Sequence, residues 1–258
     1  MSPEVSRLEE TAAIILLVII SIVRPFVPES FVWGLAVVQI LLLIRAISGH
    51  DWNMVHLGIL LCSLTLFSLI PGTRRWPWSF LIPVLLYWAL LQSFRPLRLT
   101  VTWLRTGHPT LPIWIVAGTV ALGSAVSLLL WFKLARPDVK WQAGLIPPWS
   151  PGRLVLLGLG FALFNAAVEE MIWRGVIFDA LERARLPTAP VVLMQAVSFG
   201  VVHLHGFPSG GLGILLASAY GAILGFLRAQ TRGLLVPFVT HAVTDSSIFV
   251  ILVYLAHD

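Results

Sequence analysis

Long apolar segments constrain this chain more than any other feature of its sequence. A helix that spans a bilayer needs about 20 predominantly apolar residues, and most of these segments have that length. Only 11% of the residues are charged, whereas about a quarter are charged in soluble globular proteins. The sequence therefore predicts an all-α, polytopic membrane helical bundle of eight or nine transmembrane helices, and the count is eight if the first segment, interrupted by Arg24 and Pro25, does not span. The segments lie near residues 10–27, 31–47, 54–71, 76–94, 111–132, 153–182, 189–204, 212–229 and 234–256.

The charged residues outside these segments suit a membrane better than a nucleic acid. The 17 basic residues lie mostly in short connections, as membrane topology and anionic headgroups favour. No basic patch interleaved with aromatic residues indicates nucleic-acid binding, so the expected partner surface is the lipid bilayer. Basic connections tend to face the cytoplasm, which predicts that connections 183–185 and 228–232 lie on the cytoplasmic side. The basic linker 133–153 then falls on the other side, against the same tendency.

Two features bear on the compartment and on redox chemistry. Cys62 is the only cysteine, which excludes an intrachain disulfide and a CxxC site and indicates a small buried residue. The first ten residues carry three glutamates and one arginine, which is unlike a signal peptide, so the first segment is expected to be retained. The size and the absence of targeting signals suggest a prokaryotic inner (cytoplasmic) membrane.

The chain divides into parts of different character. Residues 1–135 are predicted to be N-terminal transmembrane helices with ionisable groups almost only in their connections. The Pro-rich stretch 136–152 reads as an irregular or interfacial linker. Residues 153–258 carry Glu, Arg, His and Asp within the apolar segments themselves. Any chemistry is therefore expected in this last part.

The stretch AVEEMIWRGV at residues 167–176 carries three ionisable groups inside an apolar segment. Burying charge in a bilayer costs at least about 2.5 kcal/mol a residue unless the charge is paired. Glu170 and Arg174 are four residues apart, so they share a helix face and can form an ion pair. Glu169 is rotated by about 100° and needs a partner elsewhere in the bundle. The alternative is that both glutamates only hold helices together.

Two later segments supply the other polar groups. His203 ends the stretch QAVSFGVVH, four residues after Phe199, whereas His205 is expected at the surface or in a loop. His241 and Asp245 are an i,i+4 pair in the last apolar segment, where the carboxylate could fix the role of one imidazole nitrogen. Each group alone could be a helix-end hydrogen bond or an interhelical contact.

Together these groups have the chemistry of peptide hydrolysis. A carboxylate in a desolvated site can act as a general base on water, and histidines can donate hydrogen bonds to the oxyanion of an attacked carbonyl. Two His and one Glu could instead form an open zinc site. The HExxH motif is absent, so the expectation is a site without metal or other cofactor, with Zn²⁺ as the alternative.

Three ordered motifs resemble a known family. EExxxR at 169–174, FxxxH at 199–203 and HxxxD at 241–245 follow one another on successive apolar segments. This order resembles the CAAX protease and bacteriocin-processing (CPBP) family, whose eukaryotic members include the type II CAAX prenyl endopeptidase. The flanking text WRGVIFDAL and YGAILGFLRAQTRGLLVPFVTHA fits as well. The resemblance covers residues 153–256 and leaves the first half uncovered.

The resemblance implies a role for each motif residue. Glu169 would activate water, and His203 and His241 would bind that water or the oxyanion. Glu170 and Arg174 would be supporting residues, and Phe199 a packing residue. Family members often carry Asn at the last position, where this chain has Asp245. Because an ionised Asp cannot donate a hydrogen bond, Asp245 would orient His241 or be held protonated.

The sequence thus predicts a metal-independent, glutamic intramembrane endopeptidase that cleaves near the C-terminal or membrane-proximal end of a membrane-associated protein or peptide. Prenylated proteins, bacteriocin precursors and C-terminal sorting tails are all open as substrates. The alternatives are a non-catalytic immunity or chaperone protein of the same family, and a proton-coupled transporter, which also uses buried charges. Rhomboid-type, aspartyl and cysteine proteases are disfavoured because their motifs are missing.

Overall fold

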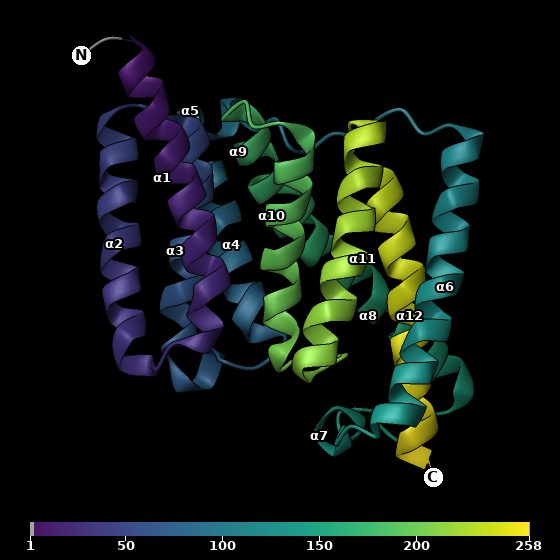
Figure 1. Cartoon of the computed structure of the whole chain (residues 1–258). Helices are drawn as coiled ribbons and strands as arrows, with labels where there is room; N and C mark the ends of the chain where they lie inside the picture. Colours follow the sequence, from purple (N-terminus) through teal and green to yellow (C-terminus); the bar gives the residue numbers. More distant parts are fainter. Residues whose placement is uncertain (1–2, 258) are drawn as a thin grey trace.

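The computed structural model describes residues 3–257 of the chain, and within that range it contains helices and no strand. The helices run side by side as a bundle (Figure 1). In chain order they are α1 (Pro3–Val23), η1 (Arg24–Phe26), α2 (Glu29–Ser48), α3 (Trp52–Ser68), η2 (Pro71–Thr73), α4 (Trp78–Ser93), α5 (Arg95–Leu99), α6 (Leu111–Ala135), α7 (Lys140–Ala143), α8 (Pro151–Glu170), η3 (Met171–Ile177), α9 (Phe178–Arg183), α10 (Thr188–Val201), η4 (Val202–Leu204), α11 (Gly210–Thr231) and α12 (Leu235–His257).

The all-helical fold confirms the sequence prediction, and each predicted apolar segment falls on a helix. In the described part of the chain five helices are both long and apolar enough to cross a membrane. Three further apolar helices are shorter than a full span, so the number of eight or nine transmembrane helices stays a prediction. The five long helices are Glu29–Ser48, Leu111–Ala135, Pro151–Arg183, Gly210–Thr231 and Leu235–Tyr254.

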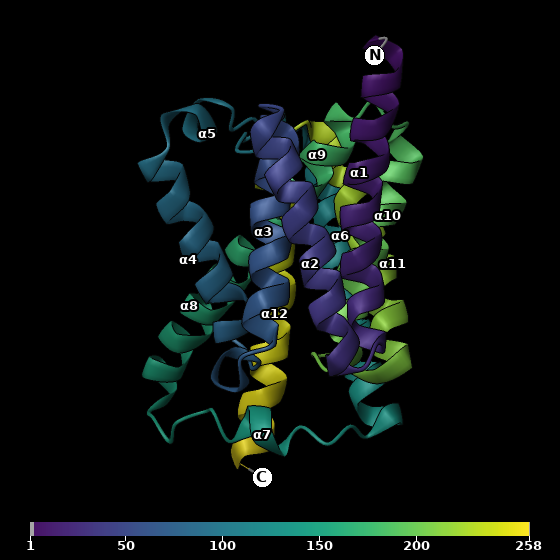
Figure 2. The same ribbon diagram turned by 90° about the vertical axis from the view of Figure 1, so that its left-hand side faces the viewer.

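The helices are arranged on two sides of the bundle, and α6 of the N-terminal part lies with the helices of the C-terminal part (Figure 1). Helices α1 to α4 lie on one side, α6, α8, α11 and α12 on the other, and α9 and α10 lie between them. The N-terminus is at one end of the bundle, and α7 and the C-terminus are at the opposite end, here called the α7 end (Figure 2). The predicted 136–152 linker contains α7 as its one short helix and runs across this end.

Helices α8, η3 and α9 form one continuous helix from Pro151 to Arg183. The middle part, η3, is a π-helix that begins directly after Glu170. Every residue of η3 is buried. Short π-helical stretches inside α-helices occur frequently at functional sites, and this one follows the EE pair and contains Arg174, the last residue of the motif.

Small residues let α11 pack closely against α10. They recur every four residues and are all buried, so they form a single face of α11. Such a face lets two helix backbones approach each other inside a membrane. A Cβ on the third of them would lie 3.0 Å from the ring of Phe199 and 3.2 Å from the Cα of Ala196. This packing fixes the position of α10, which carries the second motif. The residues are Gly213, Ala217, Gly221 and Gly225.

A close backbone crossing fixes the start of α12. The connection before α6 runs past the connection between α11 and α12, with hydrogen bonds from Leu234 N to Arg105 O (2.7 Å) and from His108 N to Thr231 O (2.8 Å). Gly107 has a φ of +82°, and a Cβ on Gly233 would overlap the Gly107 backbone. Glycine alone fits such a left-handed conformation and close approach without strain.

Candidate active site

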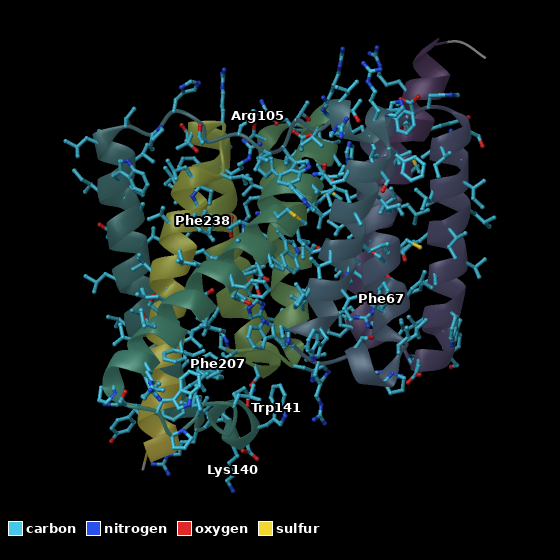
Figure 3. All side chains as sticks on the ribbon, turned by 180° about the vertical axis from the view of Figure 1, so that it is seen from behind. Phe67, Arg105, Lys140, Trp141, Phe207 and Phe238 are labelled. Carbon is cyan, nitrogen blue, oxygen red and sulfur yellow. The ribbon has the colours of Figure 1, made fainter. Side chains whose placement is uncertain are left out.

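A large cavity lies between the two halves of the bundle. Its volume is about 1390 Å³, and it is lined by residues of the C-terminal part together with residues from α1, α2, α3, α4, α6 and the linker. The lining includes Trp141 and Phe207, which lie toward the α7 end of the bundle, whereas Arg105 marks the opposite end (Figure 3). The cavity therefore extends from the middle of the bundle to the α7 end. The predicted site residues that line it are Glu169, Phe199, His203, His241 and Asp245.

The two adjacent glutamates have different surroundings. Glu169 lines the cavity, and its Oε2 lies 3.5 Å from Nε2 of His241. Glu170 is 1% exposed and is not part of the lining. Its Oε1 lies 3.1 Å from Nη1 of Arg174, which is itself 0% exposed. The predicted Glu170–Arg174 ion pair is thus present, and of the two carboxylates only that of Glu169 can meet a ligand in the cavity.

His241 is held between carboxylates from two helices. Its Nδ1 lies 2.7 Å from Oε1 of Glu170, which is a short hydrogen bond. Its Nε2 lies 3.5 Å from Oε2 of Glu169 and 3.5 Å from Oδ1 of Asp245. The hydrogen-bonded partner that orients the ring is therefore Glu170, and Asp245 lies beside the other nitrogen. Of the two roles expected for Asp245, orienting His241 or being held protonated, this geometry favours Glu170 for the first.

His203 reaches the same cavity from η4, one turn after Phe199. Its Nδ1 donates to the carbonyl oxygen of Phe199 at 3.0 Å, which leaves Nε2 available to a ligand. The Phe199 ring lies between the two histidines, with centroids 4.8 Å from His203 and 5.9 Å from His241. His205, which was expected at the surface or in a loop, is exposed.

Two buried arginines, Arg174 and Arg228, lie next to the site but outside the cavity lining. The Arg174 guanidinium carbon lies 4.4 Å from the Phe199 ring centroid, and Nη2 donates to the carbonyl oxygen of Gly221 at 3.3 Å. Arg228 is 1% exposed, and its Nε donates to the carbonyl oxygen of Arg174 at 3.1 Å. These contacts join η3, α10 and α11. They also give both arginines the partners that a buried charge needs, since an arginine without partners would be costly in this interior.

The structure adds three polar residues to those predicted. Asn165 Nδ2 donates to Oδ2 of Asp245 at 3.0 Å, and Trp76 Nε1 donates to Oδ1 of Asn165 at 2.9 Å. Tyr220 donates to Oγ1 of Thr244 at 3.0 Å, and its ring meets the His241 ring edge-on at 5.6 Å. Asn165 precedes Glu169 by four residues, so the spacing that paired Glu170 with Arg174 could have indicated it. No comparable signal indicated Trp76 or Tyr220.

The expectation about metals concerns the same residues. Among the described residues, no three or more His, Cys, Asp or Glu side chains are arranged to hold a metal ion. A structural zinc ion takes four ligands, and a catalytic one takes three protein ligands and a water. Glu169, His203 and His241, the set named for the zinc alternative, do not form such a group.

The comparisons with known proteins agree with the three motifs. The family model of type II CAAX prenyl endopeptidase Rce1-like proteins matches residues 151–247, which include all three motifs. No curated protein and no solved structure matches the chain. The resemblance inferred from the motifs is confirmed over residues 151–247, which match the model of this membrane protease family. With its apolar helices, the chain is a multi-pass integral membrane protein.

Proposed function

We propose that this protein is a glutamic intramembrane endopeptidase that cleaves near the C-terminal or membrane-proximal end of a membrane-associated protein or peptide. The observation that carries the proposal is the division between the two glutamates. Glu169 lines a cavity of about 1390 Å³, whereas Glu170 is not part of the cavity lining and is paired with the buried Arg174. The Rce1-like match of the domain supports the same reaction class.

In the proposed reaction, a water molecule attacks the scissile carbonyl carbon while the Glu169 carboxylate takes its proton. The proton then passes to the leaving amine as the carbon–nitrogen bond breaks, which regenerates the carboxylate. His241, as an imidazolium among three carboxylates, is the proposed donor to the tetrahedral oxyanion. His203, whose Nδ1 carries the proton, is the proposed group that accepts a hydrogen bond from the attacking water at Nε2. Two observations support their roles: the Nδ1 atoms of His203 and His241 are hydrogen-bonded, to the Phe199 carbonyl and to Glu170, and both rings line the cavity.

We expect the site to work without a metal ion, since in the proposed reaction a carboxylate activates the water and histidine side chains bind the reacting groups. Its expected location is a prokaryotic inner membrane. The apolar lining favours a substrate segment that is itself apolar, and the substrate classes left open by the sequence remain prenylated proteins, bacteriocin precursors and sorting tails. Peptide hydrolysis is the function that this site supports best.

The test compares host membranes that contain the wild-type protein, Glu169→Gln or Glu182→Gln. Glu182 is exposed at the end of α9, so its variant makes the same chemical change outside the cavity. C-terminal peptides of membrane and surface proteins are measured by mass spectrometry. Tails that persist only with Glu169→Gln support a protease and identify its substrate. Identical tails with all three folded proteins would contradict the proposal and favour a non-catalytic role or transport.

A further inference from the structure

A chain of two hydrogen bonds leads from the N-terminal half into the site. Trp76 lies in the connection before α4 and donates to Oδ1 of Asn165 on α8 at 2.9 Å. Asn165 Nδ2 then donates to Oδ2 of Asp245 on α12 at 3.0 Å. All three residues line the cavity. Trp76 lies outside the Rce1-like match at 151–247, so the first half of the chain contributes directly to this group.

The chemistry of the two neighbours fixes the direction of the Asn165 amide. An indole N–H can only donate, so the Asn165 atom that faces Trp76 has to be the carbonyl oxygen. An ionised carboxylate can only accept, so the atom that faces Asp245 has to be the nitrogen. The amide orientation therefore follows from its partners and does not depend on how the side-chain oxygen and nitrogen were assigned.

Asp245 needs such a donor because of its position. Its Oδ1 and the Oε2 of Glu169 both lie 3.5 Å from Nε2 of His241. Two carboxylates thus approach one imidazole nitrogen, and without a donor of its own Asp245 would compete with Glu169 for that nitrogen. Asn165 lies one helical turn before Glu169, on the same face of α8. Its side chain also has a hydrogen-bonding interaction with the Glu169 carboxylate, so Asn165 lies beside both carboxylates and can keep them in separate positions.

We propose that Asn165 is a positioning residue of the reaction, which fixes the Asp245 carboxylate beside His241 by donating to it from α8. The hydrogen bond from Asn165 fixes the position of the Asp245 carboxylate, so that Glu169 is the carboxylate available to water. The hydrogen bond from Trp76 keeps the Asn165 amide in the required orientation. This inference rests on the proposed endopeptidase function. The competing explanation is a polar contact that only joins α8 to α12.

An exchange of the two side chains separates these explanations. Asn165→Asp places two carboxylates opposite each other and removes the donor. Asp245→Asn keeps a hydrogen bond, because the Asn165 amide can donate to the new carbonyl oxygen. The double variant Asn165→Asp/Asp245→Asn keeps every bond: Trp76 donates to one oxygen of the carboxylate now at position 165, and the new amide at position 245 donates to the other oxygen. Only the direction of the last bond is reversed.

The full-length variants are assayed in lipid nanodiscs with a fluorogenic peptide that spans the cleavage site identified by mass spectrometry of the host membranes. We expect Asn165→Asp to lower kcat about 10- to 100-fold with little change in KM, the range for a lost hydrogen bond to a charged group. Asp245→Asn should be mild, and the double variant should recover kcat to within about fivefold of wild type, because residues that share one bond are not additive. Thermal unfolding in detergent is measured in parallel.

Trp76→Phe provides a second, milder variant that keeps the ring contact with Phe161 at 5.5 Å. It should lower kcat in the wild-type background and have little effect in the double variant, because a carboxylate at position 165 has two equivalent oxygens and no amide to orient. Trp78→Phe is the matched control, since Trp78 is 51% exposed.

A double variant that regains the unfolding temperature without regaining kcat would reduce Asn165 to a structural contact and overturn the inference. An unchanged kcat in Asn165→Asp would overturn it as well. Glu169→Gln in the same assay keeps the two proposals apart. If Glu169→Gln still cleaves, the proposed function fails, whereas an inactive Glu169→Gln with a failed exchange rejects only the role of Asn165.

Discussion

Oε1 of Glu170 lies 2.7 Å from Nδ1 of His241 and 3.1 Å from Nη1 of Arg174. One carboxylate oxygen thus joins the first motif to the third and also neutralises a fully buried arginine. The other oxygen, Oε2, is buried without a hydrogen-bond partner among the described residues. Glu170 is therefore a structural centre of the site, while its neighbour Glu169 faces the cavity.

Glu170→Gln should destabilise the protein far more than Glu169→Gln. The substitution leaves the Arg174 charge buried without its counter-ion, and breaking one partner of a buried pair costs about 3–5 kcal/mol. Glu169→Gln removes the proposed base, but Glu169 has no arginine partner to leave unpaired. Thermal unfolding in detergent, together with the peptide assay, measures both effects. Equal stability and equal activity in the two variants would refute this division of labour.

Phe199→Leu should have a larger effect on the rate of cleavage, measured as kcat, than on the stability of the fold, measured as the unfolding temperature. The ring lies against the Arg174 cation at 4.4 Å and between the His203 and His241 rings, so losing it removes a cation–π contact worth about 2 kcal/mol in a desolvated site. Leucine keeps an apolar side chain there but no flat surface to space the imidazoles. The check is kcat and the unfolding temperature of the same preparation. A variant with wild-type kcat would show that Phe199 does not position the histidines.

Gly221→Ala should separate α11 from α10. The added Cβ lies 3.0 Å from the Phe199 ring and 3.2 Å from the Cα of Ala196, and overpacking of this kind costs about 1–3 kcal/mol. Gly118→Ala on α6 is the matched control, because nothing lies within 4 Å of its added Cβ. The control should be neutral or stabilising, since Ala favours a helix over Gly by about 1 kcal/mol. Equal unfolding temperatures for the two variants would contradict the close-packed face.

Much of the site could be predicted because charge in an apolar segment is costly and therefore conspicuous. The i,i+4 spacing was enough to pair Glu170 with Arg174, and three motifs on three segments indicated a shared site. Spacing within one helix could not show that Nδ1 of His241 is held by Glu170 of α8, and not by Asp245, which shares α12 with His241. That contact depends on how α8 and α12 pack.

Uncharged polar residues were missed for the same physical reason. Asn165 and Trp76 carry no formal charge, so they did not stand out among the ionisable groups of the apolar segments, although their hydrogen bonds reach Asp245. Nothing in the composition of MIWRGVI indicates the π-helix of η3. The helices themselves were predictable from apolar length, whereas the number that cross the bilayer was not, because three of them are shorter than a span.

Tyr87→Phe should lower stability without changing the catalytic step. The Tyr87 hydroxyl lies 2.8 Å from Nδ1 of His56 and accepts from Nε1 of Trp103 at 3.0 Å, and these groups join α3, α4 and the connection before α6. Its loss leaves two buried groups without that partner, at a cost of about 1–3 kcal/mol. The unfolding temperature should fall while kcat per folded molecule stays constant. A change in kcat would show that this network communicates with the cavity.

Chelation distinguishes the glutamic site from the zinc alternative. If Glu169 alone activates the water, incubation with EDTA or 1,10-phenanthroline followed by desalting should leave kcat unchanged. If Glu169, His203 and His241 held zinc, the same treatment should abolish cleavage, and added Zn²⁺ should restore it, because a zinc-bound water would be the nucleophile. Phenanthroline that inhibits only before desalting reports a reversible effect of the chelator itself, so its non-chelating 1,7-isomer is the control. Loss of activity that Zn²⁺ alone restores would overturn the metal-independent mechanism, and the role of Glu169 would then change from base to ligand.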